Sequence, residues 1–131
     1  DPAEYYADGV RESLKAWGVG NDFDNYITKV PYGGLESIIE QKWIASWTTA
    51  QEAWFDWRRT GLPDLKTGPS AIRPVLPIRW YYHTNDEVEK NRANVEAAVE
   101  RLEATPYQGT DQTKNSAWSK MWVLQGTGKP Y

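Results

Sequence analysis

The sequence predicts a mainly α-helical fold in which several helices stack on one another. Apolar residues recur three or four positions apart over most of residues 1–61 and again over residues 84–104, which is the period of a helix with one buried face. Between these segments, residues 62–83 contain Pro63, Pro69, Pro74 and Pro77. Proline removes a backbone donor and blocks a helix, so residues 62–83 are expected to form an ordered, extended loop.

The first helix is expected to begin at the start of the chain and to end near Gly18. Asp1 suits the N-cap position, and Pro2 fits the first turn of a helix. The apolar positions that follow share one face: Tyr6, Val10, Leu14 and Trp17. A second, short helix is expected over residues 22–30, because Pro31 and a pair of glycines follow it.

Residues 35–61 are expected to form one long helix. On a helical wheel, four tryptophans of this segment fall within a sector of about 80°. They are Trp43, Trp47, Trp54 and Trp57. We expect this face to lie in the core, since buried indoles remove a large apolar area from water. Gly61 can supply a left-handed C-cap, and Arg58 and Arg59 suit the negative end of the helix dipole.

The other side of this expected helix is apolar as well, at Ile38, Ile44 and Phe55. A helix with apolar residues on two sides is typical of the inside of a helical stack. The chain also begins without a methionine, directly in a helix-start pattern. We therefore expect a piece of a longer protein. An apolar surface should be exposed around the first helix, or around Ile38, Ile44 and Phe55, where a neighbouring helix would pack.

The second half of the chain is expected to contain the loop, a helix and an irregular tail. Five apolar side chains are expected to hold the loop in place: Ile72, Val75, Leu76, Ile78 and Trp80. Thr84 and Glu87 form a capping-box pattern at the start of the helix over residues 84–104. This helix has a narrow apolar stripe: Val88, Val95, Val99 and Leu102.

The tail, residues 105–131, contains the stretch SAWSKMWVL. This stretch suits a short strand or an extended segment anchored by Trp118 and Trp122. The chain is thus expected to be a single region, 1–131, with helices over residues 1–61 before the loop, the helix and the tail.

The composition excludes several classes of function. The 131 residues carry a net charge of −3 with no basic run, so nucleic acid is not an expected partner. There is no cysteine, which excludes disulfides and thiolate metal sites. No apolar run approaches the about 20 residues that cross a bilayer. The single histidine, His83, is too few ligands for a metal site or a triad, so no metal and no cofactor are expected.

Glu52 and Asp56 lie one helical turn apart among aromatic residues, which invites comparison with the paired carboxylates of glycosidases. Neighbouring carboxylates on one helix are more typical of a solvated face, and catalytic pairs normally come from different elements across a cleft. Asp56 also has Arg59 three residues later as an ion-pair partner. The sequence therefore predicts no catalytic residue, and the protein is not expected to be an enzyme.

The run Trp80-Tyr81-Tyr82 in the loop is a better candidate for ligand contact. Loops on rigid scaffolds carry binding sites, and flat indole and phenol faces stack on sugar rings. In an extended segment Trp80 and Tyr82 point to one side and Tyr81 to the other, so at least one side is expected to be core. Trp80 and Tyr82 are the candidate ligand-binding residues.

The chain resembles the C-terminal part of the SusD/RagB-type outer-membrane lipoproteins of Bacteroidetes. The stretch QKWIASWTTAQEAWFDWRRTGLPDL is similar to a QKW, EAW and WRRTG block of that family. The stretch PIRWYYHTNDEVEKNRANVEAAV is similar to the loop and helix that follow it, although Tyr82-His83 stands where a Tyr-Pro is common. AEYYADGVRESLKAWGV is also similar to a family helix, and the ending SAWSKMWVL is an approximate version of a Trp-rich ending.

This resemblance implies tetratricopeptide-like helix pairs, of which the chain would form the last helices and a C-terminal cap. It implies non-catalytic capture of nutrient oligosaccharides, in polysaccharide utilisation, at the cell surface of the outer membrane. The implied partners are a TonB-dependent SusC-like transporter, an oligosaccharide or a peptide ligand, and the remaining part of the parent chain, which would carry the lipid anchor. The alternative is a helical-repeat module that binds proteins or peptides.

Overall fold

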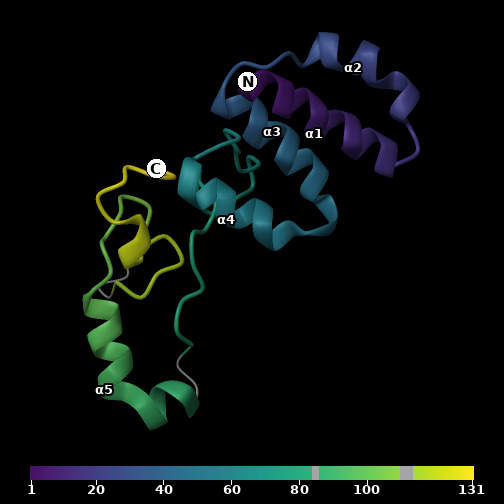
Figure 1. Cartoon of the computed structure of the whole chain (residues 1–131). Helices are drawn as coiled ribbons and strands as arrows, with labels where there is room; N and C mark the ends of the chain where they lie inside the picture. Colours follow the sequence, from purple (N-terminus) through teal and green to yellow (C-terminus); the bar gives the residue numbers. More distant parts are fainter. Residues whose placement is uncertain (84–85, 110–113) are drawn as a thin grey trace. The chain divides into compact units, whose positions relative to one another are not determined.

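The structure, a computed structural model, describes residues 1–83, 86–109 and 114–131. It forms two compact units, Asp1–Pro63 and Asp64–Tyr131 (Figure 1). Within the described residues the regular elements are all helices, and the only β-type pairing is an isolated antiparallel bridge between Glu103 and Lys120. The expected mainly α-helical, tetratricopeptide-like fold is confirmed. In the part of the chain that the structure describes, no helix has the length and apolarity to cross a bilayer.

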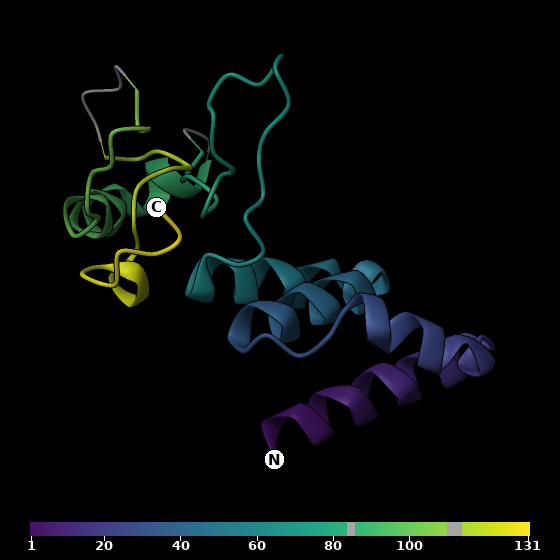
Figure 2. The same ribbon diagram turned by 90° about the horizontal axis from the view of Figure 1, so that it is seen from above.

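The first unit begins with α1, Pro2–Ala16, as the sequence predicts. Asp1 caps this helix, because its Oδ1 accepts a hydrogen bond of 2.9 Å from the backbone N–H of Ala3. After Gly18, which has a φ of +75°, a short 3₁₀ turn over Gly20–Asp22 leads into α2, Phe23–Lys29. Figures 1 and 2 both show α1 lying beside the helix that follows α2, so the three helices form a small layered body.

The expected long helix over residues 35–61 is wrong. The structure has α3, Leu35–Ala45, a 3₁₀ turn over Ser46–Thr48, and α4, Ala50–Thr60. Thr49 leaves the helical region with φ −132° and ψ 55°. Two consecutive β-branched threonines favour this break, since their side chains are restricted in a helix. The chain therefore folds back, and α4 packs against α3. The predicted stop is confirmed: Gly61 is left-handed with φ +74°, and its N–H donates to Trp57 O at 2.7 Å.

Because the chain folds back, the four tryptophans do not share one core face. Only Trp57 is buried, with 4% of its surface exposed, and Trp54 is half-buried. Trp43 and Trp47 are 43% and 68% exposed, so their assignment to the core is wrong. The buried apolar side chains of this unit are Tyr6, Val10, Ile39 and Trp57. The expected exposed apolar surface is confirmed, since Ile38, Ile44 and Phe55 are all exposed.

In its described residues, the second unit contains one α-helix, α5, Asp86–Glu100, which has non-helical backbone angles at Asn91. The helix ends before the expected residue 104. Val95 and Val99 are half-buried, which agrees with the narrow apolar stripe. The predicted capping box of Thr84 and Glu87 lies outside the described residues, as does the side chain of Val88 in that stripe.

The tail holds the proline-rich loop within this unit. Backbone N–H groups of Ile78 and Arg79 both donate to Ala117 O, at 2.8 and 3.2 Å. The indole N–H of Trp118 donates to Val75 O at 3.0 Å. Ile78 is fully buried, but Ile72 and Trp80 are exposed, so the prediction that they anchor the loop is wrong.

The end of the tail differs in part from the sequence expectation. Trp118 is half-buried and anchors the loop, as its indole hydrogen bond shows. Trp122 is 82% exposed and begins a 3₁₀ turn over Trp122–Leu124, so it is not an anchor. The buried side chain at this end of the tail is that of Leu124 instead, with 4% exposure.

Candidate functional site

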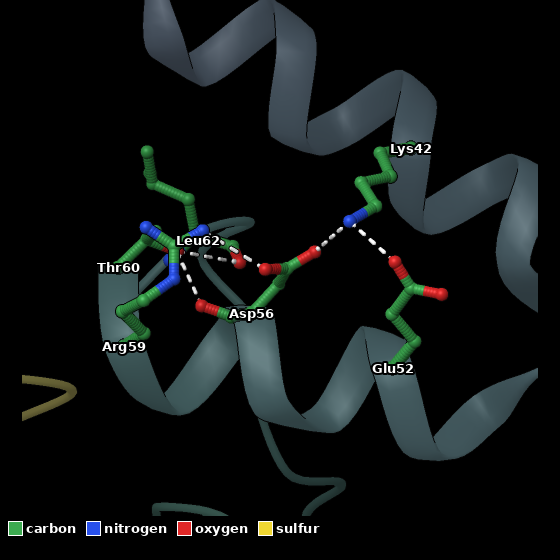
Figure 3. A network of polar contacts seen from close by, with 6 residues as sticks. All are labelled: Lys42, Glu52, Asp56, Arg59, Thr60 and Leu62. Carbon is green, nitrogen blue, oxygen red and sulfur yellow. Dashed lines mark hydrogen bonds and ion pairs between the residues drawn. The ribbon is translucent and has the colours of Figure 1, made fainter.

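Glu52 and Asp56, the two carboxylates that resemble a glycosidase pair in the sequence, take part in an ion-pair network between α3 and α4. In Figure 3, Lys42 reaches down from α3 between Glu52 and Asp56 on α4. Its Nζ lies 2.6 Å from Glu52 Oε1 and 2.8 Å from Asp56 Oδ2. A straight helix would separate residues 42 and 52 by about 15 Å along its axis. The break at Thr49 is therefore what brings these three charges together.

The predicted pair between Asp56 and Arg59 is confirmed, with Arg59 Nη2 at 2.9 Å from Asp56 Oδ1. Hydrogen bonds from Lys42 and then from Arg59 lower the pKa of Asp56, and the same contacts with Asp56 and Glu52 raise the pKa of Lys42. A general acid needs a carboxyl pKa shifted in the opposite direction. The geometry is that of a clamp that fastens α4 to α3.

The same clamp extends to the end of α4. Thr60 Oγ1 donates to Asp56 O at 2.7 Å, and it accepts a hydrogen bond of 3.1 Å from the backbone N–H of Leu62 (Figure 3). Thr60 is buried, at 7% exposure. Four polar residues of the QKW, EAW and WRRTG block thus hold α3, α4 and the chain that leaves α4 together. They are Lys42, Asp56, Arg59 and Thr60.

The second candidate, the aromatic run of the loop, lies in the other unit. Trp80, Tyr81 and Tyr82 are 81%, 47% and 41% exposed. The expectation that one side of this run is core is therefore wrong. The reason is that the buried positions come just before it, at Ile78 and Arg79, and of the three aromatic rings Arg79 lies over that of Tyr82.

Arg79 supports the run from beneath. Its guanidinium is buried, donates from Nη1 to Ser116 O at 2.8 Å, and lies 5.2 Å from the centre of the Tyr82 ring. Burial lowers the pKa of Arg79, although a guanidinium stays charged at physiological pH. Asn115 completes the support through two hydrogen bonds with the backbone of Tyr82, at 2.8 and 2.9 Å. Trp80 is thus an exposed indole on a backbone that is fixed on both sides.

Tyr81 lies on the ring of His83, with 4.7 Å between the ring centres. This contact agrees with a loop histidine. Among the described residues, no group of three or more His, Cys, Asp or Glu side chains is arranged to hold a metal ion.

A third feature was expected only in part: the sequence predicts an exposed apolar surface around the first helix or around Ile38 and Ile44, but not the pair of tryptophans at its end. A groove of about 610 Å³ runs along α1 and α3 in the first unit. At one end Trp17 and Trp47 lie together, with ring centres 5.3 Å apart and both side chains more than half exposed. The sequence analysis did not predict this pair, because it assigned Trp47 to the core face of one long helix. The pair of threonines at residues 48 and 49 was the feature that could have revealed it.

Comparisons with known proteins bear on both units. A family model described as SusD-like, starch-binding and associating with the outer membrane, matches residues 1–83. A solved structure of a chitin-binding protein is 32% identical, with a TM-score of 0.69, over 92% of this chain and 27% of that chain. The chain thus spans about a quarter of the length of that protein. No curated protein matches the chain.

Proposed function

Because the chain belongs to the SusD-like family, which is described as starch-binding and associating with the outer membrane, we propose that it is part of a cell-surface protein that captures oligosaccharides. The single observation that carries this proposal is the family match over residues 1–83, which includes the aromatic run of the loop. The likeness to a chitin-binding protein points to the same class of ligand.

We propose Trp80 as the stacking platform for a sugar ring and Tyr82 as its neighbour on the same face. An indole offers a flat apolar face, and a sugar ring that stacks on it removes its apolar C–H side from water. Arg79 and Asn115 fix the backbone on either side of Trp80 before any ligand arrives. Such preorganisation favours affinity, because little conformational freedom is lost on binding.

The ligand is captured and released without being cleaved in this proposal. The one pair of neighbouring carboxylates considered for catalysis, Glu52 and Asp56, shares the ammonium of Lys42, and the lowered pKa of Asp56 suits a permanent anion. Further parts of the proposal follow family membership. The parent protein is held at the outer membrane by a lipid anchor outside this chain, and it delivers its ligand to a TonB-dependent SusC-like transporter.

The test is calorimetric titration of the full-length protein with chito-oligosaccharides, malto-oligosaccharides and a mixed peptide library. Saturable binding of either sugar series, with no release of shorter sugars on prolonged incubation, is the expected result. Binding of peptides with no response to any glycan would overturn the proposal in favour of a peptide-binding module. Sugar release by the purified protein would overturn its non-catalytic part. Co-purification with the transporter from detergent-solubilised outer membranes tests the delivery step.

A further inference from the structure

We propose that Arg73 is a positioning residue of the sugar site: it fixes the alignment of the loop against the tail, and thereby the face on which Trp80 is presented. This inference rests on the proposed function of Trp80. It is carried by the contacts of the Arg73 guanidinium, by the order of the contacts between the loop and the tail, and by Gly109.

The guanidinium of Arg73 joins the start of the loop to two parts of the tail. Its Nε donates to Tyr107 O at 2.9 Å, and its Nη1 donates to Ile72 O at 3.1 Å. Its Cζ lies over the ring of Trp118, 5.4 Å from the ring centre. A planar guanidinium can donate hydrogen bonds in its plane while its face lies on an aromatic ring, which an ammonium group cannot do. The three contacts together thus depend on an arginine at this position.

Trp118 passes this contact on to the loop. Its indole N–H donates to Val75 O at 3.0 Å, and its carbonyl oxygen accepts a hydrogen bond of 2.7 Å from Thr105 Oγ1. Pro74 stands between Arg73 and Val75 and has no backbone N–H to donate. The side chains of Arg73 and Trp118 therefore fix this part of the loop where Pro74 cannot pair through its backbone N–H.

The contacts between the loop and the tail run in antiparallel order. Each later residue of the loop contacts an earlier residue of the tail: Val75 with Trp118, Ile78 with Ala117, and Tyr82 with Asn115. Successive side chains of an extended segment point to opposite faces, so a shift of one residue in this alignment would turn Trp80 to the other face. Arg73 lies against the first of these contacts, and it thereby sets the alignment from which the face of Trp80 follows.

Gly109 provides an independent observation. Its φ is +85°, and a Cβ at this position would collide with Nη2 of Arg73. Gly126, in the same unit, has a similar φ of +70°, but a Cβ there would meet nothing within 4 Å. Both glycines avoid the strain that a side chain meets in the left-handed region. Only Gly109 also leaves the space that the guanidinium of Arg73 occupies.

Four variants of the full-length protein test this role: Arg73→Ala, Arg73→Lys, Gly109→Ala and the control Gly126→Ala. Each is titrated calorimetrically with chito-oligosaccharides and malto-oligosaccharides, at a temperature at which circular dichroism shows that it is folded. The first three variants should lose affinity by about fivefold, whereas Gly126→Ala should melt at a lower temperature but keep the parent affinity. The double variant of Arg73→Ala and Gly109→Ala should bind no more weakly than Arg73→Ala alone, because the collision is gone.

A second measurement needs no sugar. In protein labelled with fluorotryptophan, the fluorine signal of Trp80 is identified by its loss in Trp80→Phe. This signal should shift or broaden in Arg73→Ala and Gly109→Ala and stay unchanged in Gly126→Ala. If the parent protein binds neither sugar series, the proposed function fails, and the fluorine signals still decide whether Arg73 positions Trp80.

Three results would overturn the positioning role. The first is an unchanged Trp80 signal in both Arg73→Ala and Gly109→Ala. The second is parent affinity in folded Arg73→Ala, or in Arg73→Lys, since a lysine keeps the charge without the planar contacts. The third is an equal loss of affinity in Gly109→Ala and Gly126→Ala, which would assign the effect to backbone strain alone.

Discussion

Asn115 pairs with the backbone of Tyr82 in both directions: its Nδ2 donates to Tyr82 O at 2.8 Å, and the Tyr82 N–H donates to its Oδ1 at 2.9 Å. The side-chain amide thereby takes the place that a neighbouring strand would have. It connects the tail to the loop across 33 positions of sequence. The exposed Trp80 lies two residues before this connection, so the presentation of the indole depends on it.

Asn115→Ala should loosen the aromatic run. Loss of two side-chain-to-backbone hydrogen bonds is expected to cost about 1–2 kcal/mol in the free energy of unfolding of the second unit. Urea denaturation followed by tryptophan fluorescence measures this cost. Asn94→Ala is the matched control, because Asn94 is exposed and its amide donates to Asn91 on the same helix. If both variants unfold at the same urea concentration as the parent chain, Asn115 does not hold the loop.

Trp57 and Trp47 should respond oppositely to truncation, although the two were expected to share one face. Trp57→Ala removes a buried indole and should cost about 3–5 kcal/mol. Trp47→Ala removes an indole that is 68% exposed and in ring contact with Trp17, so it should cost about 1 kcal/mol or less. Chemical denaturation of the isolated chain compares them. Similar losses in the two variants would contradict the break at Thr49.

The clamp of Lys42 and Asp56 should make the first unit sensitive to acid. The pKa of Asp56 is lower in the folded state, so its contribution to stability is complete above the unfolded-state pKa of about 3.9. That contribution is lost as the pH falls through the lower folded-state value. Asp56→Asn should therefore cost about 1–2 kcal/mol at pH 7 and show a shallower loss of stability below pH 4 than the parent chain.

The control for this prediction is Glu52→Gln. Glu52 shares the ammonium of Lys42 but its side chain is 58% exposed, so its pair should contribute about 0–1 kcal/mol. Stability curves from pH 7 to pH 2 would separate the two carboxylates. If the free energy of unfolding falls equally steeply below pH 4 in the parent chain and in Asp56→Asn, protonation of Asp56 is not coupled to folding.

Local chemistry was enough to predict much of the first unit. Asp1, the glycine at residue 18 and Gly61 act on their immediate neighbours, and each ends or begins a helix where the sequence places it. The error at Thr49 arose because a helical wheel assumes continuity. Each residue on either side of the break fits a helix, and only the low helix preference of two adjacent threonines marks the turn. One turn was enough to move Trp43 and Trp47 from the core to the surface.

The candidate binding residues were predicted by type and place, but their support was not. Trp80 and Tyr82 stand out as aromatic residues in a loop. In the sequence, nothing distinguishes Arg79 from an ordinary surface arginine. In the structure it is buried beneath Tyr82, where contacts with the tail hold it. Such contacts join segments more than thirty residues apart, and neither periodicity nor propensity carries that information. The resemblance to a family therefore carried the functional prediction further than any single motif.

We expect Trp80 to be the indole on which a sugar ring stacks. Trp80 and Trp122 lie in the same unit and are almost equally exposed, at 81% and 82%, so truncation of either should leave the fold intact. The decisive measurement is the affinity of the full-length protein for its oligosaccharide, by titration calorimetry, with Trp80→Ala and with Trp122→Ala. We expect at least a tenfold loss of affinity for Trp80→Ala, equivalent to about 1.4 kcal/mol, and no loss for Trp122→Ala. Unchanged affinity in Trp80→Ala, with both variants folded, would contradict it.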